Sequence, residues 1–310
     1  MKILFSARDA LWPEYKPALE AEFARLNLSV ELTRDTSDPG SIDYIIYAPA
    51  RDDDDLSVYK NVRLIQSLWA GPDKLLKNPT LTQPLARMVE PGMTQTMTEF
   101  VLGQVLYHHL HTQDFVTMPK DDWRWDWGPP LANTRTVGFL GAGALGTACA
   151  AVVHQVGFIT IGWSRGPKPD APMQVFHGAE GLKSVLEQSD ILVLLLPNTT
   201  ATENVLNAET LALAKPGVAI VNAGRGEAID DAALLAALDS GQVRSATLDV
   251  FRQEPLPAND PYRSHPRVLV TPHVAAETQA ATACVFAAEN IARDARGETP
   301  LHLVDRSLNY

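Results

Sequence analysis

The stretch Thr136–Gly146 reads Thr-Val-Gly-Phe-Leu-Gly-Ala-Gly-Ala-Leu-Gly, and it decides the fold. Its apolar first half predicts a buried strand, the alanine-rich segment 144–156 predicts a helix, and the apolar segment 158–163 predicts a second strand. These three elements in this order form a βαβ unit. The glycines between the first strand and the helix follow the pattern Gly-x-Gly-x-x-Gly, which in this context indicates a dinucleotide site.

Each position of the glycine motif has a physical role. Gly141 permits the tight turn, Gly143 lets the backbone approach a pyrophosphate, and Gly146 lets the helix pack close to the strand. The helix N-terminus at Ala144 and Leu145 offers amide groups and the positive end of the helix dipole to the phosphates. The alternative, an ordinary glycine-rich turn, does not account for the flanking strand and helix.

The end of the second strand predicts which dinucleotide binds. Sites for NAD place an acidic residue about 20 residues past the glycines, on the ribose 2′-hydroxyl. The corresponding segment, from Trp163 onward, has no acid and offers the Ser164 hydroxyl and the positive charges of Arg165 and Lys168. An arginine binds a phosphate through two parallel hydrogen bonds, whereas a carboxylate would repel it. We therefore expect NADP(H) to be preferred, with NAD(H) as the other coenzyme; the alternative is that Arg165 is a solvated surface residue.

Composition limits the class of protein. The chain has 310 residues, enough for two domains, and its 45% apolar and 20% charged residues are typical of a globular protein. The net charge of −11 argues against nucleic acid and anionic membranes as partners. The two cysteines, Cys149 and Cys284, lack metal-ligand spacing, so we interpret them as core residues of a protein from a reducing compartment and expect no metal site.

We expect no targeting or membrane segment. The apolar start Met1–Phe5 is interrupted by Arg8 and Asp9, so it predicts a first strand rather than a signal peptide. The longest apolar run, 191–196, is too short to span a bilayer. These features predict a cytoplasmic protein.

Strands and helices alternate along the chain, which predicts α/β layers. For the first part we expect a helix at 14–26 and strands at 2–7, 29–33, 43–48 and 63–68. For the second part we expect helices at 145–156, 178–188, 207–214 and 230–239 and strands at 136–141, 158–163, 190–196, 218–223, 245–251 and 268–271. A long helix from Thr94 to about Thr117 would connect the parts, and a helix at about 276–296 would return the chain to the first part.

The predicted fold class is therefore α/β with two domains. A doubly wound parallel sheet of the Rossmann type is expected over 99–278, and a smaller flavodoxin-like α/β substrate domain over 1–98 and 279–310. Two segments lie outside this pattern. The acidic run Asp52–Asp55 predicts a solvated helix start. A tryptophan-rich loop is expected to pack on its own domain, on a pocket or on a second subunit, through Trp123, Trp125 and Trp127.

Three chemically capable side chains, Arg225, Glu254 and His273, follow predicted strands of the second domain. In an open parallel sheet ligands bind at the carboxyl ends of the strands, so all three are expected on the cofactor side. Reduction of a 2-oxo acid uses such a set. An arginine pairs with the carboxylate and polarises the carbonyl, a histidine donates a proton to the carbonyl oxygen, and a carboxylate fixes the histidine tautomer. Taken singly, each has a structural alternative: a surface ion pair, a solvated loop acid and a turn histidine.

Together these motifs resemble the D-2-hydroxyacid dehydrogenase family nearly end to end, and most closely its glyoxylate/hydroxypyruvate reductase branch. The family motifs are the glycine pattern, 222–226, 248–255 and 271–273. The branch resemblance lies in 163–165, 195–199, 234–241 and 304–306. The turn Gly71-Pro72-Asp73 and the region 48–55 depart from the pattern, which leaves the exact 2-oxo acid open.

The resemblance implies catalytic roles for the same residues. Arg225 would bind the substrate carboxylate, His273 would be the acid/base, and Glu254 would be its partner. The backbone amides of Ala70 and Gly71 would lie near the substrate carboxylate. Trp69 and the tryptophan-rich loop could accept an aromatic substrate side chain, which would also admit bulkier 2-oxo acids.

The resemblance also implies further cofactor contacts and an assembly. Asp249 would lie near the nicotinamide amide, and the cofactor cleft would be lined by Pro197, Asn198 and Ala223. A homodimer is implied, with the long helix and the tryptophan-rich loop at its interface, where the loop would cap either its own or the neighbouring pocket.

These inferences predict an NADPH-dependent reductase that converts a small 2-oxo acid, with glyoxylate or hydroxypyruvate as first candidates, to the D-hydroxy acid. A rival from another class is a nucleotide-sensing, corepressor-like protein that uses NAD(P)(H) as a ligand. The set of Arg225, Glu254 and His273 argues against it. A rival within enzymes is a dehydrogenase for another 2-hydroxy acid, such as phosphoglycerate, or for formate.

Overall fold

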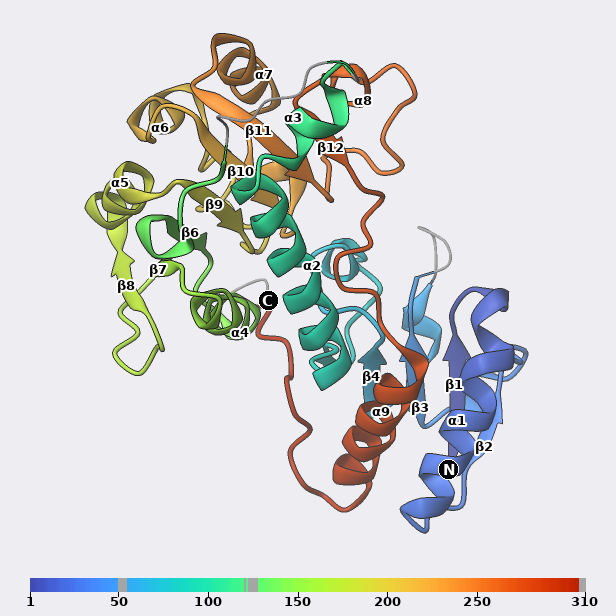
Figure 1. Cartoon of the computed structure of the whole chain (residues 1–310). Helices are drawn as coiled ribbons and strands as arrows, with labels where there is room; N and C mark the ends of the chain where they lie inside the picture. Colours follow the sequence, from blue (N-terminus) through green and yellow to red (C-terminus); the bar gives the residue numbers. More distant parts are fainter. Residues whose placement is uncertain (50–54, 120, 122–127, 307–310) are drawn as a thin grey trace. The chain divides into compact units, whose positions relative to one another are not determined.

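The computed structural model describes residues 1–49, 55–119, 121 and 128–306. It divides the chain into two units, Met1–Thr94 with Glu277–Tyr310 and Gln95–Ala276 (Figure 1). The boundaries expected from the sequence, at 98 and 278, differ from this division by a few residues. Both chain ends belong to the first unit.

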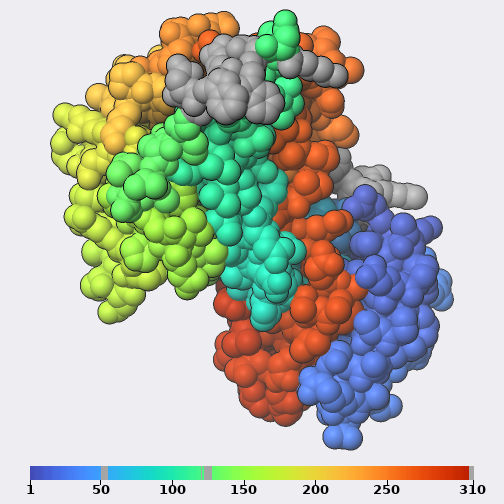
Figure 2. Space-filling view, in the orientation of Figure 1, coloured from blue at the N-terminus to red at the C-terminus, as the bar shows by residue number. Residues whose placement is uncertain are grey.

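The first unit contains a parallel five-stranded sheet in the order β2-β1-β3-β4-β5. This is the flavodoxin-like order that was expected. The strands are β1 Lys2–Ser6, β2 Glu31–Thr33, β3 Tyr44–Tyr47, β4 Leu64–Ser67 and β5 Leu85–Ala86. Helices α1 (Trp12–Arg25) and α9 (Ala280–Ala295) pack side by side, as Figure 2 shows for the blue and orange-red surfaces of this unit. Cys284 is buried in α9.

The second unit contains a parallel seven-stranded sheet in the order β12-β11-β10-β9-β6-β7-β8. Its strands are β6 Thr136–Leu140, β7 Ile159–Ser164, β8 Gln174–His177, β9 Ile191–Leu194, β10 Val218–Asn222, β11 Val243–Leu248 and β12 Val268–Val270. The order reverses between β6 and β9, which is the Rossmann topology and marks the ligand-binding switch point. The predicted fold class is confirmed.

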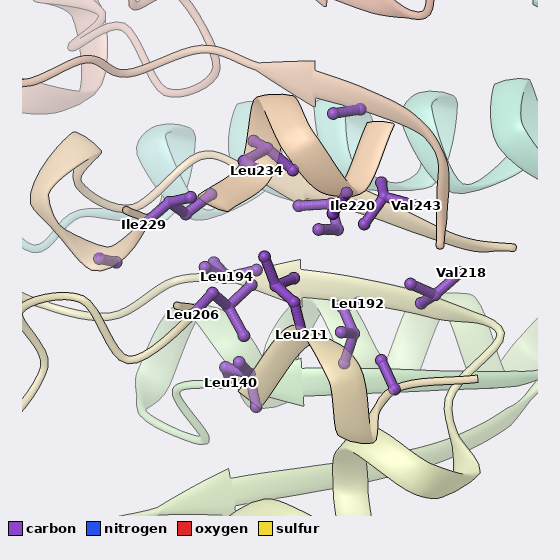
Figure 3. Packing of buried hydrophobic residues seen from close by; sticks show 14 of the residues in the cluster. Leu140, Leu192, Leu194, Leu206, Leu211, Val218, Ile220, Ile229, Leu234 and Val243 are labelled. Atoms are coloured by element: carbon purple, nitrogen blue, oxygen red, sulfur yellow. The ribbon is translucent and has the colours of Figure 1, made fainter. Parts of the chain in front are cut away.

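Helices cover both faces of the seven-stranded sheet. The helices between Pro91 and Ser264 are α2 Pro91–His109, α3 Thr112–Thr117, α4 Ala144–Gln155, α5 Gly178–Gln188, α6 Ala208–Leu213, α7 Asp231–Ser240 and α8 Pro261–Ser264. One face of the sheet, including Leu140, Leu192 and Ile220, packs against α5, α6 and α7 (Figure 3). Alternate residues on the same strands, such as Phe139 and Val193, pack against α2 and α4. This two-sided burial explains why the central strands are apolar at successive positions.

Single 3₁₀ turns connect several elements of the two units. They are η1 Asp9–Leu11, η2 Pro39–Ser41, η3 Leu56–Val58, η4 Leu75–Lys77, η5 Ala132–Thr134 and η6 Gly226–Ala228. Asp55, at the N-cap of η3, accepts a hydrogen bond from the Ser57 amide. The rest of the expected acidic helix start, 52–54, lies outside the described residues, as do the three tryptophans of 123–127. None of the described helices is both long and apolar enough to cross a membrane.

The expected long helix 94–117 is wrong in one respect, because the structure has two helices. α2 ends at His109 and α3 begins at Thr112, and between them His111 adopts the left-handed conformation with φ 56°. A helix cannot continue through a residue with this φ. After the break, the Gln113 side chain donates to the carbonyl of Pro266 at 2.8 Å. The sequence analysis did not predict this tertiary contact.

The C-terminal part of α2 is anchored on the sheet by a buried imidazole. His108 Nδ1 lies 2.9 Å from the Ser245 hydroxyl, and its Nε2 lies 3.0 Å from the Thr247 hydroxyl. Thr247 donates onward to the Gln104 side chain at 3.1 Å, so its oxygen accepts from Nε2–H and Ser245 donates to Nδ1. This network holds a neutral ring. Burial, the largest cause, with the positive charge of Arg244, lowers the pKa of His108 to about 4.

We expect His108 to make stability fall in acid. Between its unfolded pKa near 6.5 and its folded pKa near 4, the unfolded chain binds a proton that the folded chain does not. The free energy of unfolding therefore falls by about 3 kcal/mol as the pH drops through this window, and this group does not change it above the window. Denaturant titrations at pH 7, 5.5 and 4.5 should show a shallower loss in His108→Gln than in the wild-type chain. The exposed His154→Gln is the control. Equal slopes for His108→Gln and the wild type would contradict the expectation.

Candidate active site

The glycine motif forms the tight turn between β6 and α4. Gly141 has φ +113°, and a Cβ atom there would lie 2.7 Å from the carbonyl oxygen of Leu195. A Cβ atom at Gly146 would collide with the carbonyl oxygen of Gly141, so the first turn of α4 lies directly against the loop. The roles expected for these two glycines therefore follow from the backbone geometry.

The start of α4 fits a phosphate group. Gly143 is the N-cap residue and provides no side chain to accept hydrogen bonds from the first amide groups of the helix. Within the described part of the chain, a Cβ atom at Gly143 would meet no atom within 4 Å. Gly143 and Ala144 are exposed, and Leu145 is half-buried. An open helix N-terminus of this kind is suited to a pyrophosphate.

The loop that follows β7 carries the residues assigned to the 2′-phosphate. Ser164 is buried at the end of the strand and donates a 2.5 Å hydrogen bond to the Gly166 carbonyl. Arg165 and Lys168 are exposed. Trp163 donates from its indole nitrogen to the carbonyl oxygen of Gly178 at 2.9 Å, which fixes the indole against the start of α5. The Ser164 hydroxyl is thus bonded within its own loop here.

The loop after β10 presents Arg225. The buried Asn222 side chain accepts from the Gly224 amide at 3.1 Å and donates to the Arg225 carbonyl at 2.9 Å, which closes the turn. Gly226 lies so close to the backbone of Phe251 that no side chain would fit there. Arg225 is half-buried, and its guanidinium donates to the Gly224 carbonyl at 2.7 Å. The loop with Arg225 is therefore packed against the segment that leads to Glu254.

His273 and Glu254 form a hydrogen-bonded pair. His273 Nδ1 lies 3.0 Å from Glu254 Oε2, and the other carboxylate oxygen accepts from the Phe251 amide at 3.1 Å. Because a carboxylate only accepts, Nδ1 carries the hydrogen of this bond, and Nε2 is the ring nitrogen that Glu254 does not contact. The imidazole is half-exposed, whereas the Glu254 side chain is mostly buried. The structure brings together the two residues that the sequence analysis paired.

The backbone at His273 adopts an unusual conformation, with φ 58°. The buried Asp249 carboxylate holds this loop at three points. Oδ1 accepts from the Thr271 hydroxyl at 2.6 Å and from the Val274 amide at 2.9 Å, and Oδ2 accepts from the Ala275 amide at 2.9 Å. A non-glycine residue in this region costs about 1–3 kcal/mol unless its surroundings compensate. Asp249, which the resemblance placed near the nicotinamide, therefore positions the histidine loop.

The other cofactor residues also follow strands of the second sheet. Pro197 and Asn198 come after β9, and Ala223 comes after β10. All strands of this sheet are parallel, so these residues share the carboxyl edge with the glycine loop, Arg225 and Asp249. The loop after β9 lies beside the glycine loop, since β6 and β9 are neighbours at the switch point.

The proposed substrate turn lies in the first unit. Trp69, Ala70 and Gly71 follow β4 and are half-buried. The buried Ser67 hydroxyl bonds to both the amide and the carbonyl of Trp69, at 2.8 and 3.1 Å, and Thr278 donates to the Leu68 carbonyl at 2.8 Å. Sequence reasoning missed Ser67 and Asn222 as residues that fix turns. The short Ser-x-x and Asn-x-x turn patterns were the available signal.

A Rossmann sheet that carries a glycine-rich loop, an arginine and a histidine–glutamate pair at its carboxyl edge defines a dinucleotide-dependent oxidoreductase. Residues 105–275 match the family model described as "D-isomer specific 2-hydroxyacid dehydrogenase, NAD binding domain". The chain belongs to the D-isomer specific 2-hydroxyacid dehydrogenase family.

Two curated relatives of this chain carry a name that is more specific than the name of the family. The chain is 36% identical over 261 residues to "Glyoxylate/hydroxypyruvate reductase A" of Salmonella paratyphi B, covering 81% of this chain and 83% of the relative. It is 39% identical over 252 residues to the protein of the same name from Serratia proteamaculans, covering 79% and 80%.

Solved structures give the same family. A D-isomer specific 2-hydroxyacid dehydrogenase from Xanthobacter autotrophicus, in complex with NADPH and MES, is 36% identical with a TM-score of 0.91, covering 100% of this chain and 99% of that one. An NADPH-dependent glyoxylate/hydroxypyruvate reductase from Sinorhizobium meliloti, in complex with NADP and sulfate, is 32% identical with a TM-score of 0.90, covering 100% of both chains.

Proposed function

We propose that the protein reduces a small 2-oxo acid to the D-2-hydroxy acid with NADPH, with glyoxylate and hydroxypyruvate as first candidates. The observation that carries this proposal is the hydrogen bond of 3.0 Å between His273 and Glu254 at the carboxyl edge of the Rossmann sheet. A histidine–carboxylate pair in this place supplies a proton donor next to a nicotinamide site. The names of the relatives support the substrate class and the coenzyme.

The proposed chemistry joins a hydride and a proton to one carbonyl. The bound coenzyme supplies the hydride to the carbonyl carbon. Arg225 pairs with the substrate carboxylate and orients the carbonyl. His273 donates the proton from Nε2 to the carbonyl oxygen, which becomes the hydroxyl, and Glu254 stabilises the charged ring before that transfer through Nδ1–H.

A panel of 2-oxo acids tests this function. NADPH oxidation, followed by absorbance, should show turnover with glyoxylate, hydroxypyruvate or a related 2-oxo acid, and the ranking should report the side chain that the pocket accepts. Chiral analysis of the product should give the D-enantiomer. Tight NADPH binding without turnover of any substrate would contradict the proposal and favour a nucleotide-sensing protein.

The coenzyme preference is expected to depend on the loop after β7. Ser164→Asp with Arg165→Ala places a carboxylate where the 2′-phosphate would bind and removes a charged partner. The ratio of kcat/KM for NADPH to that for NADH should fall about 100-fold, because a charged hydrogen bond contributes about 1.5–3 kcal/mol. The matched control is Lys183→Ala, a charge loss on the exposed surface of α5. An unchanged ratio would remove Ser164 and Arg165 from the site.

We also propose a homodimer formed through the region after α2. Large apolar side chains are exposed around the break that follows α2 and beyond it: Leu110, Phe115, Val116 and Leu131. Val116 and Leu131 are each 72% exposed, which supports burial against a second copy. Light scattering on the purified chain should give twice the mass of 33.8 kDa, and a monomer at working concentration would contradict the proposal.

A further inference from the structure

A cavity of about 400 Å³ lies at the edge of the second unit's sheet, between the loop after β7 and strand β8. Its walls include the apolar side chains of Met173 and Val175, and its polar lining includes Lys168 and His177. Met173 lies close to the glycine loop, and Gly162 of β7 shows this. A Cβ atom at Gly162 would lie 2.7 Å from the Met173 methyl group and 3.3 Å from the Cβ atom of Ala142, which belongs to the glycine loop. The cavity is thus adjacent to the dinucleotide-binding edge.

The strand register places His177 beside the end of β7. β7 and β8 are parallel neighbours, and Ser164 is paired with His177 at the carboxyl ends of both strands. Neighbouring strands are about 4.8 Å apart, so the two backbones are adjacent at this point. The bond from the Trp163 indole to the Gly178 carbonyl, one residue after His177, fixes the two strand ends to each other.

The two basic side chains of this cavity are available for a ligand. Among the described residues, neither the Lys168 ammonium nor the His177 imidazole forms a hydrogen bond or an ion pair, and both residues are exposed. Glu180, the acid of the first turn of α5, does not line the cavity. A cavity with basic donors and apolar walls is complementary to a phosphate monoester that lies beside an apolar ring, as the ribose 2′-phosphate of NADP(H) lies beside the adenine.

We propose that His177 is a further specificity residue, which donates a hydrogen bond to the ribose 2′-phosphate of NADP(H) together with Lys168. This inference rests on the proposed binding of the 2′-phosphate at Ser164 and Arg165. It extends the phosphate site from one strand end to two, so that the end of β8 contributes to the choice of NADPH over NADH.

Dissociation constants for NADPH and NADH, measured by quenching of protein fluorescence, test the inference. His177→Val keeps a strand-forming residue and removes the donor. NADPH affinity should fall about threefold to fivefold, the size of an exposed charged contact, while NADH affinity stays unchanged. His177→Arg should give a preference for NADPH at least as strong as the wild type. His154→Gln, at the opposite end of α4, is the control that should change neither constant.

The outcomes separate this inference from the assignment on which it rests. If His177→Val leaves the ratio of the NADPH to the NADH dissociation constant unchanged while Arg165→Ala raises it, His177 has no part in recognition and the inference is overturned. If Arg165→Ala leaves the ratio unchanged as well, the 2′-phosphate assignment itself fails. Equal losses for NADPH and NADH in His177→Val would show a structural effect on β8, which also overturns the inference.

Discussion

Replacing His273 with asparagine is expected to lower kcat about 1000-fold, because a positioned general acid contributes about 10²- to 10⁴-fold to a proton transfer. Asparagine keeps a polar group of similar reach and tolerates the positive φ at this position, so the loop should be retained. The dissociation constant for NADPH should change little, since the lost group acts on the substrate carbonyl. Steady-state kinetics with the best 2-oxo acid and a coenzyme titration measure the two quantities.

The partner of the histidine provides the matched comparison. Glu254→Gln keeps an acceptor oxygen for Nδ1–H and removes the negative charge, so we expect a smaller loss of kcat than in His273→Asn. The double variant should lose little more than His273→Asn alone, because the two residues act as one unit. Equal loss of NADPH binding and turnover in His273→Asn would show that the histidine is structural.

Replacing Arg225 with alanine is expected to raise the apparent KM for the 2-oxo acid and to lower kcat/KM about 100-fold, which corresponds to roughly 3 kcal/mol for a charge-assisted pair. Arg225 is a half-buried residue, so we expect water to replace its guanidinium only in part. Arg225→Lys retains the charge without the two parallel donors and should recover only part of the loss.

A second substrate type makes the arginine test specific. The arginine variant should discriminate less between a 2-oxo acid and the corresponding aldehyde or ketone without a carboxylate, because the lost interaction is with the carboxylate. Arg263→Ala, at an exposed guanidinium bonded to the carbonyls of Leu256 and Pro257, is the control for loss of a surface arginine. An unchanged KM for the 2-oxo acid in Arg225→Ala would place the carboxylate elsewhere.

The parts of the fold that local pattern determines could be predicted from the sequence. The segment from β6 to β7 combines apolar strands, a glycine turn and an alanine-rich helix, and each local preference agrees with the final structure. Edge strand β8 was missed, because Gln174–His177 is short and follows a segment with several prolines. The break at His111 was missed because neither glycine nor proline marks it; it depends on tertiary contacts such as that of Gln113 with Pro266.

In the candidate site, too, the sequence predicts some features and misses others. Pairing of His273 with Glu254 could be inferred, since both follow strands whose carboxyl ends meet at one edge. The arrangement around Asp249 could not, because its hydrogen bonds reach residues 22 to 26 positions further along the chain. Sequence spacing alone does not show that the buried carboxylate of Asp249 holds the loop that carries His273.

The close packing of Gly226 on Phe251 has a consequence for how this enzyme can diverge. Arg225 and Glu254 lie on loops that cannot move independently, and Asp249 ties the histidine loop to the same strand end. A substitution that shifts one of these groups is expected to shift the others, so we expect substitutions here to weaken the proposed reaction rather than redirect it. New substrate ranges are therefore expected to arise on other segments, such as 69–71 of the first unit, while 222–275 is inherited as one piece.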